Sequence, residues 1–187
     1  ILAVVLLLLL GTGMLTAAAG SRTGDAQVRT ERDLQLQSVT MEELEEIRER
    51  EKGGMTGLLN IAGWRYGEAG NVKEPLSGKK AGAGTVYVNG PVSLAFPAKV
   101  LSGSYESVMG KKDCVLTREL SWSLFGSVDT AGCQVDFGGK TYTVTAVIDK
   151  EEMVMFLTAD EGAVQKAAFS FSGRERIDSK MKALGFE

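Results

Sequence analysis

The stretch that decides the fold is "LTRELSWSLFGSVDTAGCQVDFGGKTYTVTAVID", which covers residues 116–149. The apolar spacing of "RELSWSLFG" predicts a short helix that ends at Gly126, because glycine readily adopts the left-handed conformation that stops a helix. Alternating residues then predict two strands, "CQVDF" and "KTYTVTAVID", joined by Gly138-Gly139, a pair typical of two-residue hairpin turns. The stretch contains no histidine and no nucleophile beside a base. We therefore interpret it as scaffold rather than as a reaction site.

A helix of about nine residues is not stable alone in water, so packing must hold it in place. We expect Leu124, Phe125 and Gly126 to form a corner that fixes this helix to the sheet. Leu120 is expected on the same side as Leu124, with Trp122 beside it. The strands predicted to contact the corner are those around Val115, Val135 and Val144.

The last strand of the stretch should present two faces, because successive side chains of a strand point in opposite directions. Tyr142 and Val144 are expected on the same face, and they belong to one predicted structural motif with the glycine pair. The full set expected on that face is Tyr142, Val144 and Ala146, and the set expected on the other is Thr141, Thr143, Thr145 and Val147.

Outward from this stretch the pattern alternates between helices and strands. "TMEE" at Thr40–Glu43 fits a capping box that begins a helix, and Gly53-Gly54 ends it. The closing segment "RERIDSKMKALG" has a helical apolar stripe, whereas 67–84 is expected to be a loop or a long hairpin connection. The predicted fold class is α+β, with a mixed, mostly antiparallel sheet and a few short helices. The further predicted strands are 56–66, 85–91, 113–117, 153–159 and 165–173.

The N-terminal segment, residues 1–20, carries no charged residue. About 20 apolar residues are long enough to span a bilayer as a helix, so we predict a transmembrane helix here. A cleaved secretory signal is the alternative, since small residues follow the apolar run. Both readings place the rest of the chain outside the cytoplasm. We expect 21–39 to be a juxtamembrane connector, or a helix continuing out of the membrane, and 40–187 to be the extracytoplasmic domain.

The composition argues against several classes of function. The net charge of −3 provides no basic field for nucleic acid, and the absence of histidine removes the commonest general base. Ser121 and Ser123 do not lie in a G-x-S-x-G turn, and the "GKK" at 78–80 lacks the spacing of a phosphate-binding loop. We therefore expect no enzymatic activity, no cofactor and no nucleic-acid partner.

The two cysteines, Cys114 and Cys133, leave two readings open. An exported domain permits one disulfide between them. Alternatively, both are free thiols on strands that pack as small hydrophobic groups. Two thiols without histidine leave zinc coordination unfilled, so no metal site is expected.

The ordered set of motifs from "LSGSYES" to "TVTAVID" resembles the MacB-like periplasmic core domain of ABC transporter permeases. That family has a glycine turn before an apolar strand, a short helix ending in "LFG", a G-x-x-[IV] strand, a glycine hairpin and a [FY]-x-V-x-[GA]-V strand. The likeness is clear over 92–160 and collinear elsewhere. Ala146 stands where the family more often has glycine, and the transmembrane helices that normally follow the domain are absent. We therefore expect a fragment of a longer permease, truncated in its last helix, or a shortened relative.

The resemblance implies a permease subunit of the cell membrane, with this domain on the extracytoplasmic side. It would couple ATP hydrolysis by a separate ABC-type ATPase to the movement of a substrate or partner, as a homodimer or heterodimer of permeases. The alternative is a membrane-anchored or exported binding or adaptor module outside any transporter. The residues of the expected structural motif are Leu124, Phe125, Gly126, Gly138, Gly139, Tyr142 and Val144.

Overall fold

The structure is a computed structural model that describes residues 27–54, 56–105, 109–173 and 176–186. The predicted transmembrane helix at 1–20 lies outside these residues. Within the described ranges, no helix is both long enough and apolar enough to cross a membrane.

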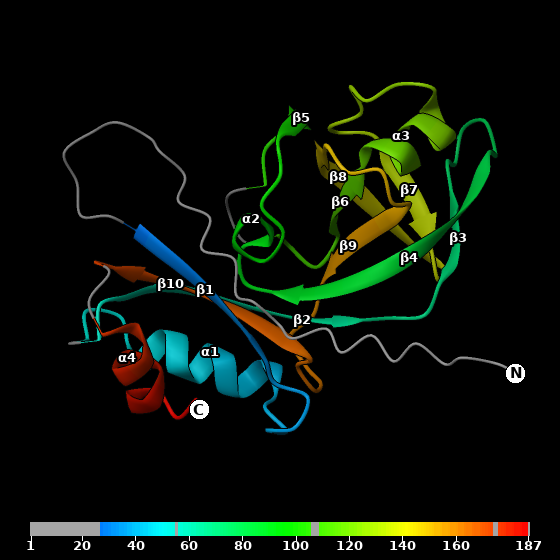
Figure 1. Ribbon diagram of the computed structural model, residues 1–187. Helices are drawn as coiled ribbons and strands as arrows, with labels where there is room; N and C mark the ends of the chain where they lie inside the picture. The colour runs from blue at the N-terminus through cyan, green and yellow to red at the C-terminus, as the bar shows by residue number, and fades with distance from the viewer. Residues whose placement is uncertain (1–26, 55, 106–108, 174–175, 187) are drawn as a thin grey trace, which may run out of the picture.

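The first layer of the fold is the three-stranded end of one continuous 10-stranded sheet, and helices lie on one face of it (Figure 1). The edge strand β1 (Gln27–Asp33) pairs antiparallel with β10 (Lys166–Ser172), and β10 pairs antiparallel with β2 (Leu58–Tyr66). Helices α1 (Met41–Arg50) and α4 (Ile177–Ala183) cover this sheet. Phe169 and Phe171 of β10, with Leu44 of α1 and Met181 of α4, form the buried cluster between them.

The second layer is a closed ring of strands. Strand β4 (Lys80–Asn89) pairs with β9 (Val154–Thr158), β9 with β6 (Asp113–Thr117), and β6 with β8 (Lys140–Ile148). The ring continues through β7 (Gln134–Phe137) and β3 (Gly70–Lys73) back to β4. The β4–β9 and β6–β8 pairs are parallel and the other ring pairs antiparallel. The predicted α+β class with a mixed, mostly antiparallel sheet is confirmed.

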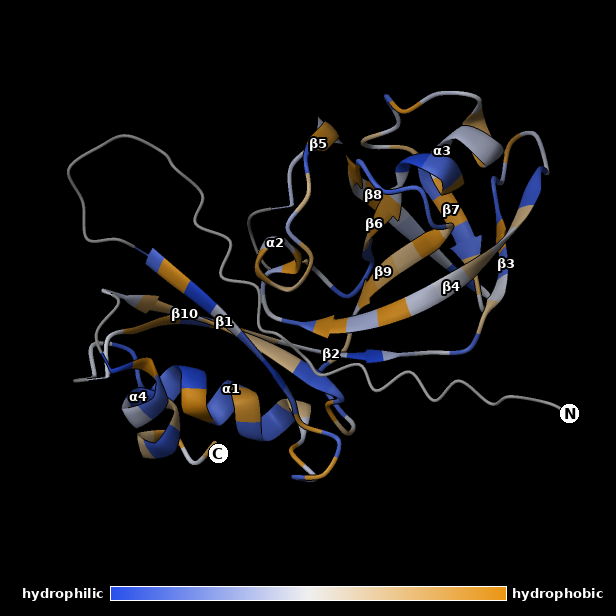
Figure 2. Cartoon of the chain, in the orientation of Figure 1, coloured by the Kyte–Doolittle hydropathy of each residue, from blue (hydrophilic) through white to orange (hydrophobic). Residues whose placement is uncertain are grey.

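The interior of the ring is filled by side chains from every one of its strands and from helix α3 (Arg118–Phe125). A second cluster lies between β2, the ring and the short helix α2 (Val92–Ala95), with Trp64 and Phe156 packed on Phe96. Strand β5 (Val100–Gly103) extends this region by pairing with β8. Figure 2 shows the hydrophobic residues concentrated on β6, β8 and β9, whereas β1 is largely polar.

The predicted capping box of α1 is confirmed. The Thr40 hydroxyl accepts a hydrogen bond from the Glu43 N–H at 3.2 Å, and the Glu43 carboxylate accepts one from the Thr40 N–H at 2.8 Å. These bonds satisfy donors that a helix start leaves unpaired. Met41 and Leu44 are buried against the first sheet, so the apolar face lies where the sequence predicts it.

Local structure differs from the prediction in two segments. Residues 27–33 form strand β1, paired with β10 through seven residues, rather than part of a connector or helix. The pattern was missed because this edge strand buries only Val28 and otherwise carries polar side chains, as protected sheet edges do. Of the two alternatives expected for 67–84, the structure has the hairpin, formed by β3 and the first half of β4, although neither strand was predicted there. Here small residues, Ala81 and Ala83, alternate into the ring, and such residues give a weak strand signal.

Candidate functional site

The corner formed by α3 takes the predicted local conformation. The helix covers Arg118–Phe125 and ends at Gly126, whose φ of 67° and ψ of 21° are left-handed. The Gly126 N–H donates to the Trp122 carbonyl at 2.8 Å. A side chain at this position would meet no neighbouring atom within 4 Å, so glycine is needed here for its backbone freedom rather than for space.

The buried face of α3 consists of Leu120 and Leu124, which enter the interior of the ring. Phe125 is only half-buried and packs at the edge of the same cluster. The expected packing of α3 against the strand around Val115 is confirmed, although Val115 itself does not take part. Val115 points to the cluster between the ring and α2, because neighbouring residues of β6 face opposite sides. The β6 residues that share the interior with α3 are instead Cys114 and Leu116.

Strand β8 contains a bulge that the alternation did not predict. Cys114 pairs with Val144 but Val115 pairs with Ala146, so Thr145 is the extra residue. The Thr145 hydroxyl donates to the Cys114 carbonyl at 3.1 Å. Val144 therefore shares the ring interior with Val147, and Ala146 lies in the other cluster with Ile148, in contrast to the two faces predicted.

The predicted hairpin turn is confirmed by its backbone. Gly138 and Gly139 have φ values of 57° and 76°, and Phe137 pairs with Lys140 across them. Two consecutive positive φ values are the signature of the turn that matches strand twist. Tyr142 is half-buried against the interior cluster, and burial raises the pKa of its hydroxyl. The motif residues Leu124, Phe125, Tyr142 and Val144 therefore converge on one cluster, whereas the glycines lie at turns.

The loop after α3 is held in place by the hydroxyl groups of serine and threonine side chains. The buried Ser121 hydroxyl donates to the Ser127 carbonyl at 2.8 Å and lies 2.8 Å from the Thr130 hydroxyl. The Ser102 hydroxyl donates to the Asp129 carboxylate at 2.9 Å. Ser121, weighed in the sequence as a nucleophile, is thus engaged in holding this loop. In the described part of the chain, no three His, Cys, Asp or Glu residues gather as a metal site.

The cysteines lie on opposite sides of β8. Cys114 pairs with Val144 from β6, and the Val144 N–H donates to the Cys133 carbonyl from the β7 side at 2.8 Å. Two strand spacings amount to about 10 Å, beyond the Cα separation that a disulfide tolerates. Both cysteines are free. Burial, followed by the charge of Asp113, raises the pKa of the Cys114 thiol, which makes it unreactive.

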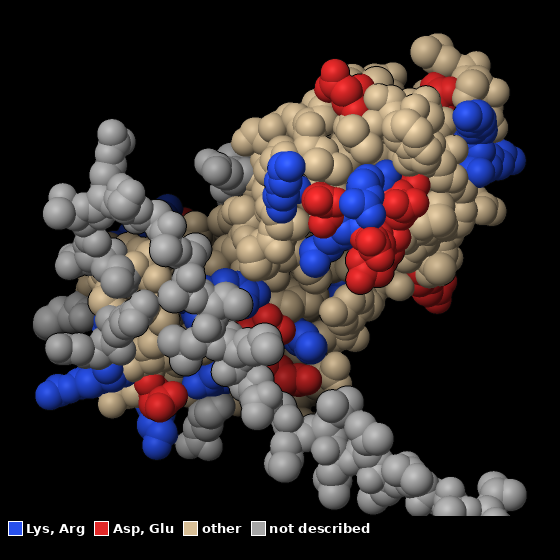
Figure 3. All heavy atoms as spheres, turned by 45° about the horizontal axis from the view of Figure 1, so that its top comes forward, with Lys and Arg blue, Asp and Glu red and all other residues tan. Residues whose placement is uncertain are grey.

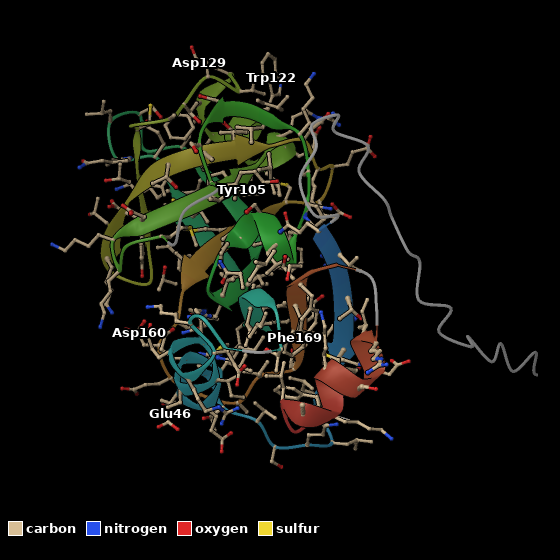
Figure 4. All side chains as sticks on the ribbon, turned by 90° about the vertical axis from the view of Figure 1, so that its left-hand side faces the viewer. Glu46, Tyr105, Trp122, Asp129, Asp160 and Phe169 are labelled. Carbon is tan, nitrogen blue, oxygen red and sulfur yellow. The ribbon has the colours of Figure 1, made fainter. Side chains whose placement is uncertain are left out.

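The outer face of α3 is open to solvent. Trp122 is 58% exposed and lies at the end of the molecule away from α1, near Asp129 (Figure 4). Beside it, Arg118 contacts the carboxylates of Glu119, Asp149 and Glu151, a mixed-charge cluster of the kind visible in Figure 3. Hydrogen bonding to Glu119, with these charges, raises the Arg118 pKa.

The hairpin between β3 and β4 lies at the same end of the ring as α3 (Figure 1). Its tip presents Leu76, which is 96% exposed. The Glu74 carboxylate accepts hydrogen bonds from the backbone N–H groups of Leu76, at 2.7 Å, and of Ser77. Hydrogen bonds from Ser77 and then from the Leu76 backbone lower the Glu74 pKa. The tip is therefore an ordered turn that holds Leu76 in solvent.

Comparison with known proteins places this arrangement in a family. The family model described as the MacB-like periplasmic core domain matches residues 1–178. The chain belongs to the MacB-like periplasmic core domain family. None of the curated proteins compared with it matches.

Solved structures agree on the MacB-like fold. The periplasmic region of MacB from Actinobacillus actinomycetemcomitans is 12% identical with a TM-score of 0.59, over 75% of this chain and 69% of that one. The extracellular domain of the noncanonic ABC-type transporter YknZ from Gram-positive bacteria is 13% identical with a TM-score of 0.57, over 83% and 90%. A domain of a protein described as a permease, from Porphyromonas gingivalis, is 14% identical with a TM-score of 0.51, over 68% and 67%.

By their descriptions, the first of these structures is a periplasmic region and the second is the extracellular domain of an ABC-type transporter. The family resemblance drawn from the motifs in 92–160 is thus confirmed, and it extends over most of the chain.

Proposed function

We propose that this chain is the extracytoplasmic domain of an ABC transporter permease subunit that couples cytoplasmic ATP hydrolysis to the movement of a substrate or partner outside the membrane. Residues 1–20 form its transmembrane helix, a separate ABC-type ATPase subunit or domain hydrolyses ATP, and two permeases, alike or different, act together. The domain itself transmits motion and is not catalytic. The observation that carries the proposal is the family match over residues 1–178.

The connection of β1 supports a mechanical role. Gln27 lies opposite Ser172, and the seven-residue register from there to Asp33 joins β1 to β10 along its full length. Arg29 of β1 also donates to the carbonyls of Leu94, at 2.8 Å, and Ala95, at 3.1 Å, at the end of α2. A displacement of the segment before Gln27 would therefore reach both the first sheet and the α2 cluster. Close-packed elements of this kind move together rather than deform.

The test uses the full-length permease and its ATPase in lipid nanodiscs. A spin label is placed at Ser123→Cys, on the exposed face of α3, in a Cys133→Ser background; the fully buried Cys114 does not compete for the label. The distance to the label of the second permease is measured without nucleotide and with ATP plus vanadate. We expect the permease and the ATPase to co-purify. The distance between the two spin labels should change by several ångströms, as in other domain motions. Failure to co-purify, or an unchanged distance, would contradict the coupling role.

Membrane topology is checked separately in spheroplasts. In untreated spheroplasts the chain should be found in the membrane fraction. When protease is added outside, the segment from Ser21 onward should be digested. Release into the soluble fraction would support a cleaved signal. Retention without any associated ATPase would favour the alternative, a membrane-anchored binding or adaptor module.

A further inference from the structure

The tip of the β3–β4 hairpin, Lys73–Lys80, combines an exposed apolar side chain, that of Leu76, with a cluster of three lysines. Lys73 and Lys80 lie directly opposite each other as a cross-strand pair, and Lys79 is adjacent and exposed. Like charges facing one another across strands destabilise a hairpin. None of these three lysines lies within ion-pair distance of a described carboxylate. The blue spheres at the right-hand rim of Figure 3 lie over this hairpin.

The carboxylates near the tip are engaged within the fold. Glu74 is buried and accepts the N–H groups of Leu76 and Ser77. Asp136, on β7 beside Lys73, accepts the Thr141 hydroxyl at 2.7 Å. The three lysines outnumber these two carboxylates, so the tip keeps a net positive charge. A local conflict between like charges is typical of a functional surface rather than of a scaffold.

The backbone of the tip is ordered before any partner binds. The Glu74 N–H donates to the Lys79 carbonyl at 2.8 Å, and the Gly78 N–H donates to the Glu74 carbonyl at 3.0 Å. With the Leu76 N–H already bonded to the Glu74 carboxylate, the leucine is held outward on a fixed turn. An element ordered in advance loses little conformational entropy on binding.

The tip lies far from the end of the domain where the chain emerges from residues 1–26. Gln27 of β1 and Leu58 of β2 lie at the same end of the sheet, on either side of β10. From Leu58, strand β2 runs to Tyr66, which pairs with Val86 of β4. Strand β4 continues in the same direction from Val86 to Lys80. At about 3.3 Å per residue this path is about 45 Å long. On the proposed topology the hairpin points away from the membrane anchor, which favours a protein over the lipid surface as its partner.

We propose that the β3–β4 hairpin tip is a docking element for an acidic extracytoplasmic protein, with Leu76 inserting into an apolar pocket and Lys73, Lys79 and Lys80 facing carboxylates around it. The inference rests on the proposed function, because a transporter domain of this kind acts on a partner outside the membrane. The tip supplies the two parts of a small interface, an apolar anchor and a charged rim.

The test is site-specific photo-crosslinking in cells that carry the full-length permease. A benzoyl-phenylalanine probe replaces Leu76, and the matched control places it at Leu36, a leucine that is 99% exposed on the turn between β1 and α1. We expect one protein adduct from position 76 and none from position 36. The adduct should disappear with Lys79→Glu plus Lys80→Glu and persist with Lys182→Glu, an exposed lysine of α4.

The captured protein is then purified and its binding to the nanodisc-held permease measured. We expect Leu76→Ser to weaken the Kd about tenfold or more, Leu36→Ser to leave it unchanged, and added salt to weaken it. A lipid adduct with binding to phosphatidylglycerol vesicles, an adduct with a second copy of this chain, or equal adducts from both positions would each overturn the proposal. Co-purification with the ATPase is scored on the same Leu76→Ser sample, so loss of docking and loss of the permease role are distinguished.

Discussion

The Thr117 hydroxyl makes both hydrogen bonds to the Val154 backbone that a residue of a paired strand would make. It donates to the Val154 carbonyl at 3.2 Å and accepts from the Val154 N–H at 3.0 Å. The β6–β9 ladder ends with Leu116 opposite Met155, so Thr117 occupies the next rung while its own backbone turns into α3. The side chain thus lets the chain leave the ring without leaving the neighbouring strand unpaired.

Replacing Thr117 by valine should destabilise the domain by about 1–3 kcal/mol, because the side chain keeps its shape but leaves two backbone groups of Val154 without partners. Thr117→Ser is the matched control, since it retains the hydroxyl and should cost less. Urea unfolding of the domain from Ser21 onward, followed by tryptophan fluorescence, measures both. Equal losses for the two variants would show that the methyl group, not the hydroxyl, carries the effect.

Gly126 gives a prediction that separates backbone strain from packing. Gly126→Ala should cost about 1–2 kcal/mol, because a side chain disfavours the left-handed conformation although no atom stands in its way. Gly126→Asn should cost less, since asparagine tolerates that conformation. Gly82→Ala is the control: it also meets no atom within 4 Å but requires no positive φ, so its stability should stay within about 0.5 kcal/mol of the parent. The loss of unfolding free energy should therefore be largest for Gly126→Ala, smaller for Gly126→Asn and smallest for Gly82→Ala.

The corner of α3 should depend more on Leu124 than on Phe125. Leu124 is fully buried in the ring, so Leu124→Ala should cost about 2–5 kcal/mol through lost burial and a cavity. Phe125→Ala should cost less, because that ring is half exposed. Trp122→Ala, on the outer face, serves as the surface control and should change stability by about 0.5 kcal/mol or less. Transport by the full-length protein should fall in step with stability for Leu124→Ala.

A different result would change the role assigned to this corner. If Phe125→Ala left the melting temperature unchanged but abolished transport, Phe125 would be a contact for substrate or partner and the scaffold interpretation would be wrong.

The sequence predicted those parts of the fold that strong local rules control. The Thr40 capping box, the Gly126 stop and the Gly138-Gly139 turn each depend on a few neighbouring residues, and all three were predicted correctly. Among the missed strands, 27–33 is ordered mainly by its partner β10, and 70–73 and 80–84 are ordered mainly by each other. Their own residues are charged or small and carry little strand preference.

The candidate surface could be predicted only in part for a related reason. From the sequence, the "GKK" motif was only excluded as a phosphate-binding loop. Which residue this turn holds outward depends on the Glu74 carboxylate bonding the backbone of Leu76 and Ser77. The Thr145 bulge likewise reverses the faces of β8 through one extra residue, which alternation alone does not reveal.

The Cys114 thiol gives a prediction for alkaline pH. Burial raises its pKa in the folded state above its unfolded value of about 8.5, so the folded domain keeps a proton that the unfolded chain releases. The contribution of the Cys114 thiol to the free energy of unfolding is therefore fully present below about pH 8.5. It declines as the pH rises above that value, by up to about 1.4 kcal/mol per pH unit. Between pH 8 and pH 9.5 the unfolding free energy should fall by about 1 kcal/mol on this account.

Cys114→Ala should flatten this decline, although it lowers stability at every pH by removing a buried group. Burial also raises the pKa of the Tyr142 hydroxyl. Tyr142 therefore lowers the unfolding free energy in the same way, but only above about pH 10, outside the range from pH 8 to pH 9.5. Cys133→Ala is the matched control and should leave the pH dependence as it is in the parent. Urea titrations at four pH values measure the slope for each protein. A decline that persists unchanged in Cys114→Ala would assign it to another group, and one that is lost equally in Cys133→Ala would show that the two thiols are linked rather than separated by β8.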